Sequence, residues 1–112
     1  MLKVSFENKD GLLVLLLDGH AGQSDIGHDI VCSACSILAY TVAQVVRTAK
    51  LQGDLKNAPT IILDSGKAII SCEPNDEEID AVMSAYLFAQ VGFSLLAYNF
   101  PQYVELKPFS AE

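Results

Sequence analysis

The segment from Ala81 to Phe100 contains no charged residue, and this constrains the fold more than any other feature of the sequence. An uncharged segment of this length can cross a bilayer as a helix. It nevertheless includes Ser84, Gln90, Ser94 and Asn99, and an acidic segment precedes it. These polar residues favour a buried helix in a globular domain over a membrane span.

The flanks of this segment contain helix start and stop signals. Asn75 followed by Glu78 resembles a capping box, in which the two side chains bond free backbone N–H groups. The two acidic residues between them are favoured beside the positive end of the helix dipole. Pro101 disfavours helical backbone at the residue before it. We therefore expect the helix to start beside Asn75 and to end at residues 99–100.

An earlier helix is predicted between Asp29 and Gly53. Asp29 is the expected N-cap because its carboxylate accepts hydrogen bonds from first-turn N–H groups. Gly53 is a natural C-terminal stop. The apolar residues between them recur at helical spacing and form one broad stripe: Ile30, Val31, Ala34, Ile37, Leu38, Val42, Val45, Val46 and Ala49.

The remaining regular segments have the patterns of β-strands. Residues 2–7 alternate apolar and polar side chains, whereas residues 12–17 form the continuous apolar run typical of a central strand. Turn clusters at residues 8–11 and 64–66 predict two hairpins. The expected strands cover residues 2–7, 12–17, 60–63, 68–72 and 103–107.

The resulting element order is β-β-α-β-β-α-β. It predicts an α+β fold, a two-layer sandwich in which one sheet packs against two helices. The length of 112 residues suits a single domain, residues 1–112, that buries a sizeable core.

The composition excludes several classes of protein. Hydrophobic residues make up 51% of the chain and charged residues 19%, which excludes a disordered chain. A formal net charge of -7 argues against nucleic acid as a partner, because phosphates are repelled. Three cysteines, an odd number, argue against a disulfide-stapled secreted module, and the N-terminus lacks the pattern of a signal peptide. We therefore expect a cytoplasmic protein with reduced thiols and no membrane partner.

The segment from Asp18 to Asp29 interrupts the regular pattern. It contains both histidines, His20 and His28, and three of the seven glycines. Glycine permits backbone conformations closed to other residues. The segment therefore predicts a mobile loop, about residues 19–29, that carries functional side chains.

Cys32 and His20 are the candidate catalytic pair. Cys32 falls in the expected first turn of the helix, where free N–H groups and the helix dipole stabilise a thiolate. His20 ends an apolar strand on the loop that returns to this helix, which places a base within reach of the thiol. The structural alternative makes Cys32 a small buried hydrophobe and His20 an ordinary loop residue. Cys35 and Cys72 are expected in the core.

The same cysteines allow another chemistry. Cys32 and Cys35 form a C-x-x-C pair at a predicted helix start, the arrangement of thiol redox sites, and His20 and His28 add potential zinc ligands. Two ordinary helix formers between the cysteines and a non-standard histidine spacing weaken this interpretation. We expect no metal and no cofactor. A zinc- or redox-active thiol protein stays open as the alternative, as does a catalytically silent binding module.

The motif around the pair resembles the signature of the ribosomal-processing cysteine protease family, Prp. In that family a G-H-A-G loop precedes a D-I-V-C helix start, with the same gap of twelve residues from His to Cys. The match covers residues 19–36, and the element order and the size of the whole chain are also similar. The matching residues here are Gly19-His20-Ala21-Gly22, Gly27, Asp29-Ile30-Val31-Cys32-Ser33-Ala34 and Ser36.

The resemblance implies a cysteine endopeptidase that supports ribosome assembly. Family members remove a short N-terminal extension from a bacterial large-subunit ribosomal protein, the one numbered twenty-seven, after adjacent aromatic residues. The resemblance implies His20 as general base and Cys32 as nucleophile, with first-turn N–H groups near Cys32 as expected oxyanion donors. It also implies a homodimer. Asp29 and Ser36 also match the motif and are assigned supporting roles. The expected substrate loop contains Gly19, Gly22, Gln23 and Gly27.

Two positions depart from the family pattern. Gln23 stands where many relatives have an aromatic residue, so the substrate contacts of this position are open. Cys35 occupies a position that is usually small and apolar. A disulfide between Cys32 and Cys35 would silence the enzyme, which leaves redox control as a further hypothesis.

Overall fold

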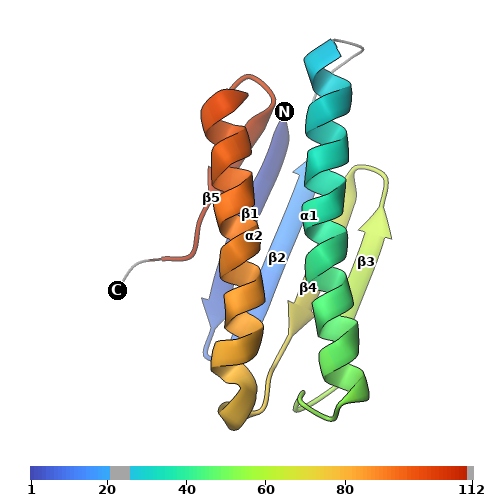
Figure 1. Cartoon of the computed structure of the whole chain (residues 1–112), viewed down its shortest axis with the longest axis vertical. Coiled ribbons are helices and arrows are strands. Elements are labelled where there is room, and N and C mark those ends of the chain that lie inside the picture. The colour runs from blue at the N-terminus through green and yellow to red at the C-terminus, as the bar shows by residue number, and fades with distance from the viewer. Residues whose placement is uncertain (21–25, 111–112) are drawn as a thin grey trace.

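The computed structural model describes residues 1–20 and 26–110, with the side chains of residues 26–29 outside this description. Its element order confirms the predicted α+β, two-layer arrangement (Figure 1). The strands are β1 (Leu2–Lys9), β2 (Leu12–Gly19), β3 (Thr60–Asp64), β4 (Lys67–Cys72) and β5 (Val104–Lys107). The helices are α1 (Ile26–Leu51) and α2 (Ile79–Asn99), and a single 3-10 turn, η1 (Asp76–Glu78), precedes α2.

The five strands form one mixed sheet in the order β3-β4-β2-β1-β5. Strand β2, the continuous apolar run, lies at the centre as expected, antiparallel to both β1 and β4. Only β5 runs parallel to its neighbour, β1. In the pairing of β2 with β4, Asp18 lies opposite Lys67. The end of β2 is therefore next to the turn between β3 and β4. This alignment brings two distant parts of the chain to one edge of the molecule.

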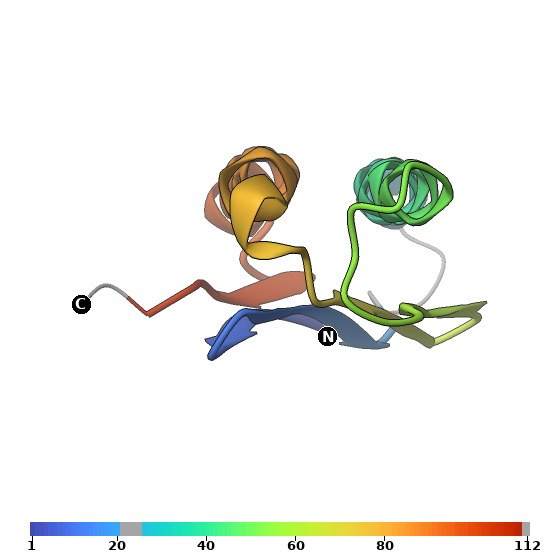
Figure 2. The ribbon, with the colours of Figure 1, turned by 90° about the horizontal axis from the view of Figure 1, so that it is seen from below.

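Both helices cover the same face of the sheet, and no helix or strand among the described residues covers the opposite face (Figure 2). The alternation in β1 places Leu2, Val4 and Phe6 in the core, as expected. Tyr86 of α2 is fully buried, and its hydroxyl donates a hydrogen bond to the Ile70 carbonyl at 3.0 Å. The core therefore lies between the sheet and the inner faces of the two helices.

The start of α1 corrects the sequence-based expectation. The helix begins at Ile26 rather than after Asp29, so Asp29 lies within the helix and is not its N-cap. An acidic residue is favoured both at the cap and in the first turn, so its presence does not distinguish these positions. The residues between Ile26 and Asp29 contain a glycine and a histidine, which gave no apolar periodicity to mark the extra turn.

The other helix signals are correct at the end of each helix, and the helical segment that leads into α2 starts after Asn75, as expected. Gly53, at φ +77°, ends α1 with hydrogen bonds from its own N–H to Lys50 O and from Asp54 N–H to Ala49 O, a Schellman motif. At α2 the expected capping box is absent. The Asn75 side-chain amide instead donates to the Gly53 carbonyl at 2.9 Å, which ties the approach to α2 to the end of α1.

The outer faces of the helices remain strongly apolar. Segments 30–51 and 76–99 are long and apolar enough to cross a membrane by length and composition alone, a property that the core helices of soluble proteins share. The helix α2 buries only its inner face against the sheet. Several large apolar side chains of the two helices are exposed: Ile30, Ile37 and Tyr40 on α1, and Leu87, Phe88, Val91, Leu95 and Tyr98 on α2.

Candidate active site

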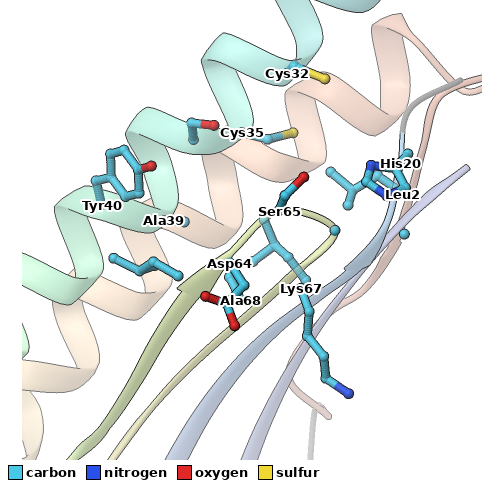
Figure 3. A pocket seen from close by; sticks show the side chains of 15 residues that line it. Leu2, His20, Cys32, Cys35, Ala39, Tyr40, Asp64, Ser65, Lys67 and Ala68 are labelled. Carbon is cyan, nitrogen blue, oxygen red and sulfur yellow. The ribbon is translucent and has the colours of Figure 1, made fainter. Parts of the chain in front are cut away.

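A cavity of about 370 Å³ lies between α1, the end of β2 and the turn that joins β3 to β4 (Figure 3). This volume falls in the range of roughly 300–1,000 Å³ typical of ligand pockets. Both members of the predicted catalytic pair line it, Cys32 from α1 and His20 from the residue after β2. Sequence segments on either side of the glycine-rich stretch thus meet at one site.

Cys32 projects from α1 into the cavity and is half-buried. It is the seventh residue of the helix, which places it in the second turn. The N–H groups that lack a partner at a helix start belong to the residues before Ile30. Cys32 therefore does not lie in the first turn, contrary to the expectation, and its own N–H lies within the regular helical pattern.

His20 lies across the cavity from α1 and is exposed (Figure 3). The chain reaches it through Gly19, which has φ +104° and lies so close to Met1 that a β-carbon there would be 2.5 Å from the Met1 carbonyl oxygen. The Met1 amino group donates a hydrogen bond to the His20 carbonyl at 2.7 Å. Position 19 therefore admits only glycine, and the backbone of His20 is tied to the start of β1.

The remaining predicted site residues have different outcomes. Ser36 lines the cavity one helical turn after Cys32, and Gly19 lines it from the end of β2. Gly22 and Gln23 lie outside the described residues. Gly27 and Asp29 belong to α1, whereas the sequence predicted that both lie in the loop of residues 19–29. The side chain of Asp29 is outside the description.

Cys35 and Cys72 are buried free thiols, as expected. Burial raises the pKa of the Cys35 thiol from its ordinary 9.0 to about 12, and the neighbouring Cys32 adds to the shift. Burial also raises the pKa of Cys72. Of the three thiols, Cys32 is the most accessible. Among residues 1–20 and the described side chains from residue 30 onward, no group of three or more His, Cys, Asp or Glu side chains could hold a metal ion.

The cavity contains residues that the sequence did not reveal as part of a site. Tyr40 lies on the α1 face of Cys32 and Ser36, and the spacing of four residues between successive members was a signal that could have found it. Asp64, Ser65 and Gly66 line the opposite wall from the β3–β4 turn. The sequence predicted a turn at residues 64–66, but it did not show that β4 pairs with β2. The turn therefore could not be connected with His20.

Known proteins resemble the chain over nearly its whole length. A family model described as cysteine protease Prp matches residues 1–105. The chain belongs to the Prp family of cysteine proteases. The predicted family is thereby confirmed. Among curated proteins, none matches the chain significantly.

Solved structures of other chains share the fold. SMU.848 from Streptococcus mutans is 24% identical with a TM-score of 0.69, over 99% of this chain and 96% of that one. The essential ribosomal processing protease Prp from S. aureus, in complex with a substrate peptide, is 20% identical with a TM-score of 0.68. In its complex with a covalently linked product peptide, the same protease is 22% identical to this chain with a TM-score of 0.67. Each S. aureus alignment covers 96% of this chain and 99% of the other.

Proposed function

We propose that the chain is a cysteine endopeptidase that removes the short N-terminal extension of a bacterial large-subunit ribosomal protein, the one numbered twenty-seven, by cutting after aromatic residues. The observation that carries the proposal is that His20 and Cys32 line one cavity in a chain of the Prp family. A cytoplasmic location, where thiols stay reduced and ribosomes assemble, is part of the same proposal.

In the proposed mechanism, the His20 imidazole accepts the proton of the Cys32 thiol, and the thiolate sulfur attacks the scissile carbonyl carbon. The resulting tetrahedral intermediate collapses with cleavage of the C–N bond. The amine leaves with the proton from the imidazolium, and a thioester forms on Cys32. Water then attacks the thioester and gives a proton to His20. The C–S bond breaks, the carboxylate product leaves, and the imidazolium proton restores the Cys32 thiol. The Ser36 hydroxyl on the cavity wall and Asp29 are assigned supporting roles.

The walls of the cavity suit an aromatic side chain of the substrate. Leu17 and Ala68 are buried beneath it, and Ala39 and Leu63 provide further apolar surface. Burial of an aromatic side chain against such surface is favourable in proportion to the apolar area removed from water. The net charge of -7 also favours the approach of a basic ribosomal protein by long-range attraction.

The experiment that tests this proposal is incubation of the purified chain with the precursor ribosomal protein, followed by mass spectrometry of the products. We expect one cut, after the aromatic residues of the extension, and no cut in a precursor whose aromatic residues are replaced by alanine. Cys32→Ala serves as the enzyme control. Full recovery of intact precursor with the folded wild-type chain would contradict the proposal.

We also propose that the chain works as a homodimer that pairs through the outer face of α2. Phe88 is 79% exposed and Tyr98 83% exposed on α2, and no charged residue lies between Ala81 and Phe100. Two copies of this uncharged face can meet without bringing like charges together, even though each chain carries a net charge of -7. Contiguous exposed apolar surface of this kind marks an interaction site in a soluble protein.

The alternative of a redox- or zinc-active thiol protein is weaker in this fold. Cys32 and Cys35 lie in the second and third turns of a long helix rather than at its N-terminus, so the free N–H groups that activate a redox thiol lie a turn away. The expected cut of the precursor, together with zinc analysis of the purified chain, distinguishes the two functions.

A further inference from the structure

The imidazole ring of His20 occupies the space that a side chain at position 66 would need. A β-carbon built on Gly66 would lie 2.7 Å from Nε2 and 2.9 Å from Cε1 of His20. Both distances are well below van der Waals contact, so the ring packs beside Gly66 and leaves no room for a β-carbon there. The two residues are far apart in the sequence, because Gly66 belongs to the β3–β4 turn and His20 follows β2. The contact therefore depends on the tertiary fold.

The turn that carries Gly66 is tied to the strand that carries His20. The Gly19 N–H donates a hydrogen bond to the Gly66 carbonyl at 2.9 Å, and the adjacent pair Asp18 and Lys67 continues the ladder between β2 and β4. Gly66 has φ +80°, a conformation that glycine adopts readily. The glycine surface is therefore held at a defined place relative to the backbone of His20.

We propose that Gly66 is a positioning residue for His20. The imidazole can turn about two side-chain bonds, and Gly66 limits that rotation by packing beside its Nε2–Cε1 edge. The ring is thereby kept beside the cavity that Cys32 lines from the opposite side. This inference rests on the proposed function of His20 as the general base.

The contact predicts a defect in catalysis rather than in folding when a methyl group is added. The imidazole is the mobile end of an exposed side chain, so it moves away from the new β-carbon while the hydrogen-bonded turn stays in place. A displacement of a base by about 1 Å costs up to a hundredfold in rate. We expect Gly66→Ala to lower kcat by about tenfold or more, with KM changed by less than about threefold.

Gly53 provides a matched control. It has φ +77°, close to that of Gly66, but no atom lies within 4 Å of the place where its β-carbon would be. Gly53→Ala therefore introduces the same backbone strain without the contact to His20. The pair Gly66→Asn and Gly53→Asn repeats the comparison with a residue that tolerates positive φ, so a folding defect of the alanine variants does not end the test.

The decisive measurement is a double-mutant cycle with His20→Ala, read by the rate at which iodoacetamide alkylates Cys32. If Gly66 acts through His20, Gly66→Ala slows alkylation in the wild-type background and changes it by less than about twofold in the His20→Ala background. Equal effects in both backgrounds, or equal effects of Gly66→Ala and Gly53→Ala, would overturn the inference. The alkylation cycle does not depend on cleavage of the ribosomal precursor. Failure of the wild-type chain to cut the precursor would contradict the proposed function, whereas the alkylation rates alone test the role of Gly66.

Discussion

Cys32 and Cys35 lie one helical turn apart on α1 and both line the cavity that His20 also lines, but their thiols have different environments. Cys32 is half-buried, whereas only 3% of Cys35 is exposed. Burial and the proximity of Cys32 raise the pKa of the Cys35 thiol to about 12. Because the thiolate is the reactive form of cysteine, the helix presents one accessible thiol and holds its neighbour neutral.

The first prediction is selective labelling of Cys32. At pH 8, a thiol with a pKa of about 12 is ionised in roughly one molecule in ten thousand, so Cys35 reacts slowly in the folded protein. We expect iodoacetamide to label Cys32 first, and Cys35 and Cys72 only after denaturation. Fragmentation mass spectrometry locates the label. The Cys32→Ser variant should stay unlabelled under native conditions, and equal labelling of Cys32 and Cys35 would contradict the prediction.

The second prediction separates the catalytic pair from the neighbouring thiol. Cys32→Ala should abolish cleavage of the extension peptide because it removes the nucleophile, and His20→Ala should lower kcat roughly 10²–10⁴-fold because it removes the base. Cys35→Ser should retain most of the activity. Initial rates with a peptide that spans the cleavage site measure all three.

The contrary result for this series is as informative as the expected one. If Cys35→Ser is as damaging as Cys32→Ala, the two thiols act together. A metal or redox function then replaces the protease, and zinc analysis of the purified wild-type chain becomes the next measurement.

The sequence was sufficient to predict that His20 and Cys32 lie at one site, because both belong to one short motif, and both line the same cavity. The residues between His20 and Cys32 include two glycines and lack the apolar pattern of a strand. The apolar patterns on either side predicted a strand before this segment and a helix after it. The fold class followed from the same patterns. The alternation of Leu2, Val4 and Phe6 and the turn at 64–66 were both correctly assigned.

The opposite wall of the site could not be predicted, for a physical reason. A hairpin such as β3–β4 can join a sheet by either edge and beside any partner strand, and its sequence does not specify which. Only the pairing of β4 with β2 brings Gly66 against His20. The start of α1 was misplaced because aspartate is favoured both as an N-cap and in the first turn, so Asp29 alone does not distinguish the two positions.

The third prediction concerns stability at high pH. Folding raises the pKa of Cys35 from its ordinary 9.0 to about 12, so between these values the folded state keeps a proton that the unfolded state loses. The stabilisation from the neutral thiol is therefore fully present below about pH 9 and is lost as the pH rises toward 12. The free energy of unfolding, measured by urea titration at several pH values, should fall across this range.

The variant Cys35→Ala tests the origin of that slope. Burial also raises the pKa values of Cys72 and Tyr86, and these groups contribute a slope of the same sign. We expect the variant to lose stability less steeply than the wild type above pH 9, with part of the slope remaining. Identical slopes in the two proteins would show that Cys35 does not titrate differently on folding.

The last prediction concerns the apolar face of the helices. Phe88→Asp places a charge at the centre of the exposed α2 surface, so the two copies of a dimer would bring like charges together in a desolvated interface, which is strongly unfavourable. We expect the wild-type chain to sediment as a dimer and Phe88→Asp to sediment as a monomer at the same concentration. Thr60→Asp adds the same charge to an exposed position of the edge strand β3 and should remain dimeric. A wild-type chain that sediments as a monomer in water and partitions into liposomes would instead assign this face to a membrane.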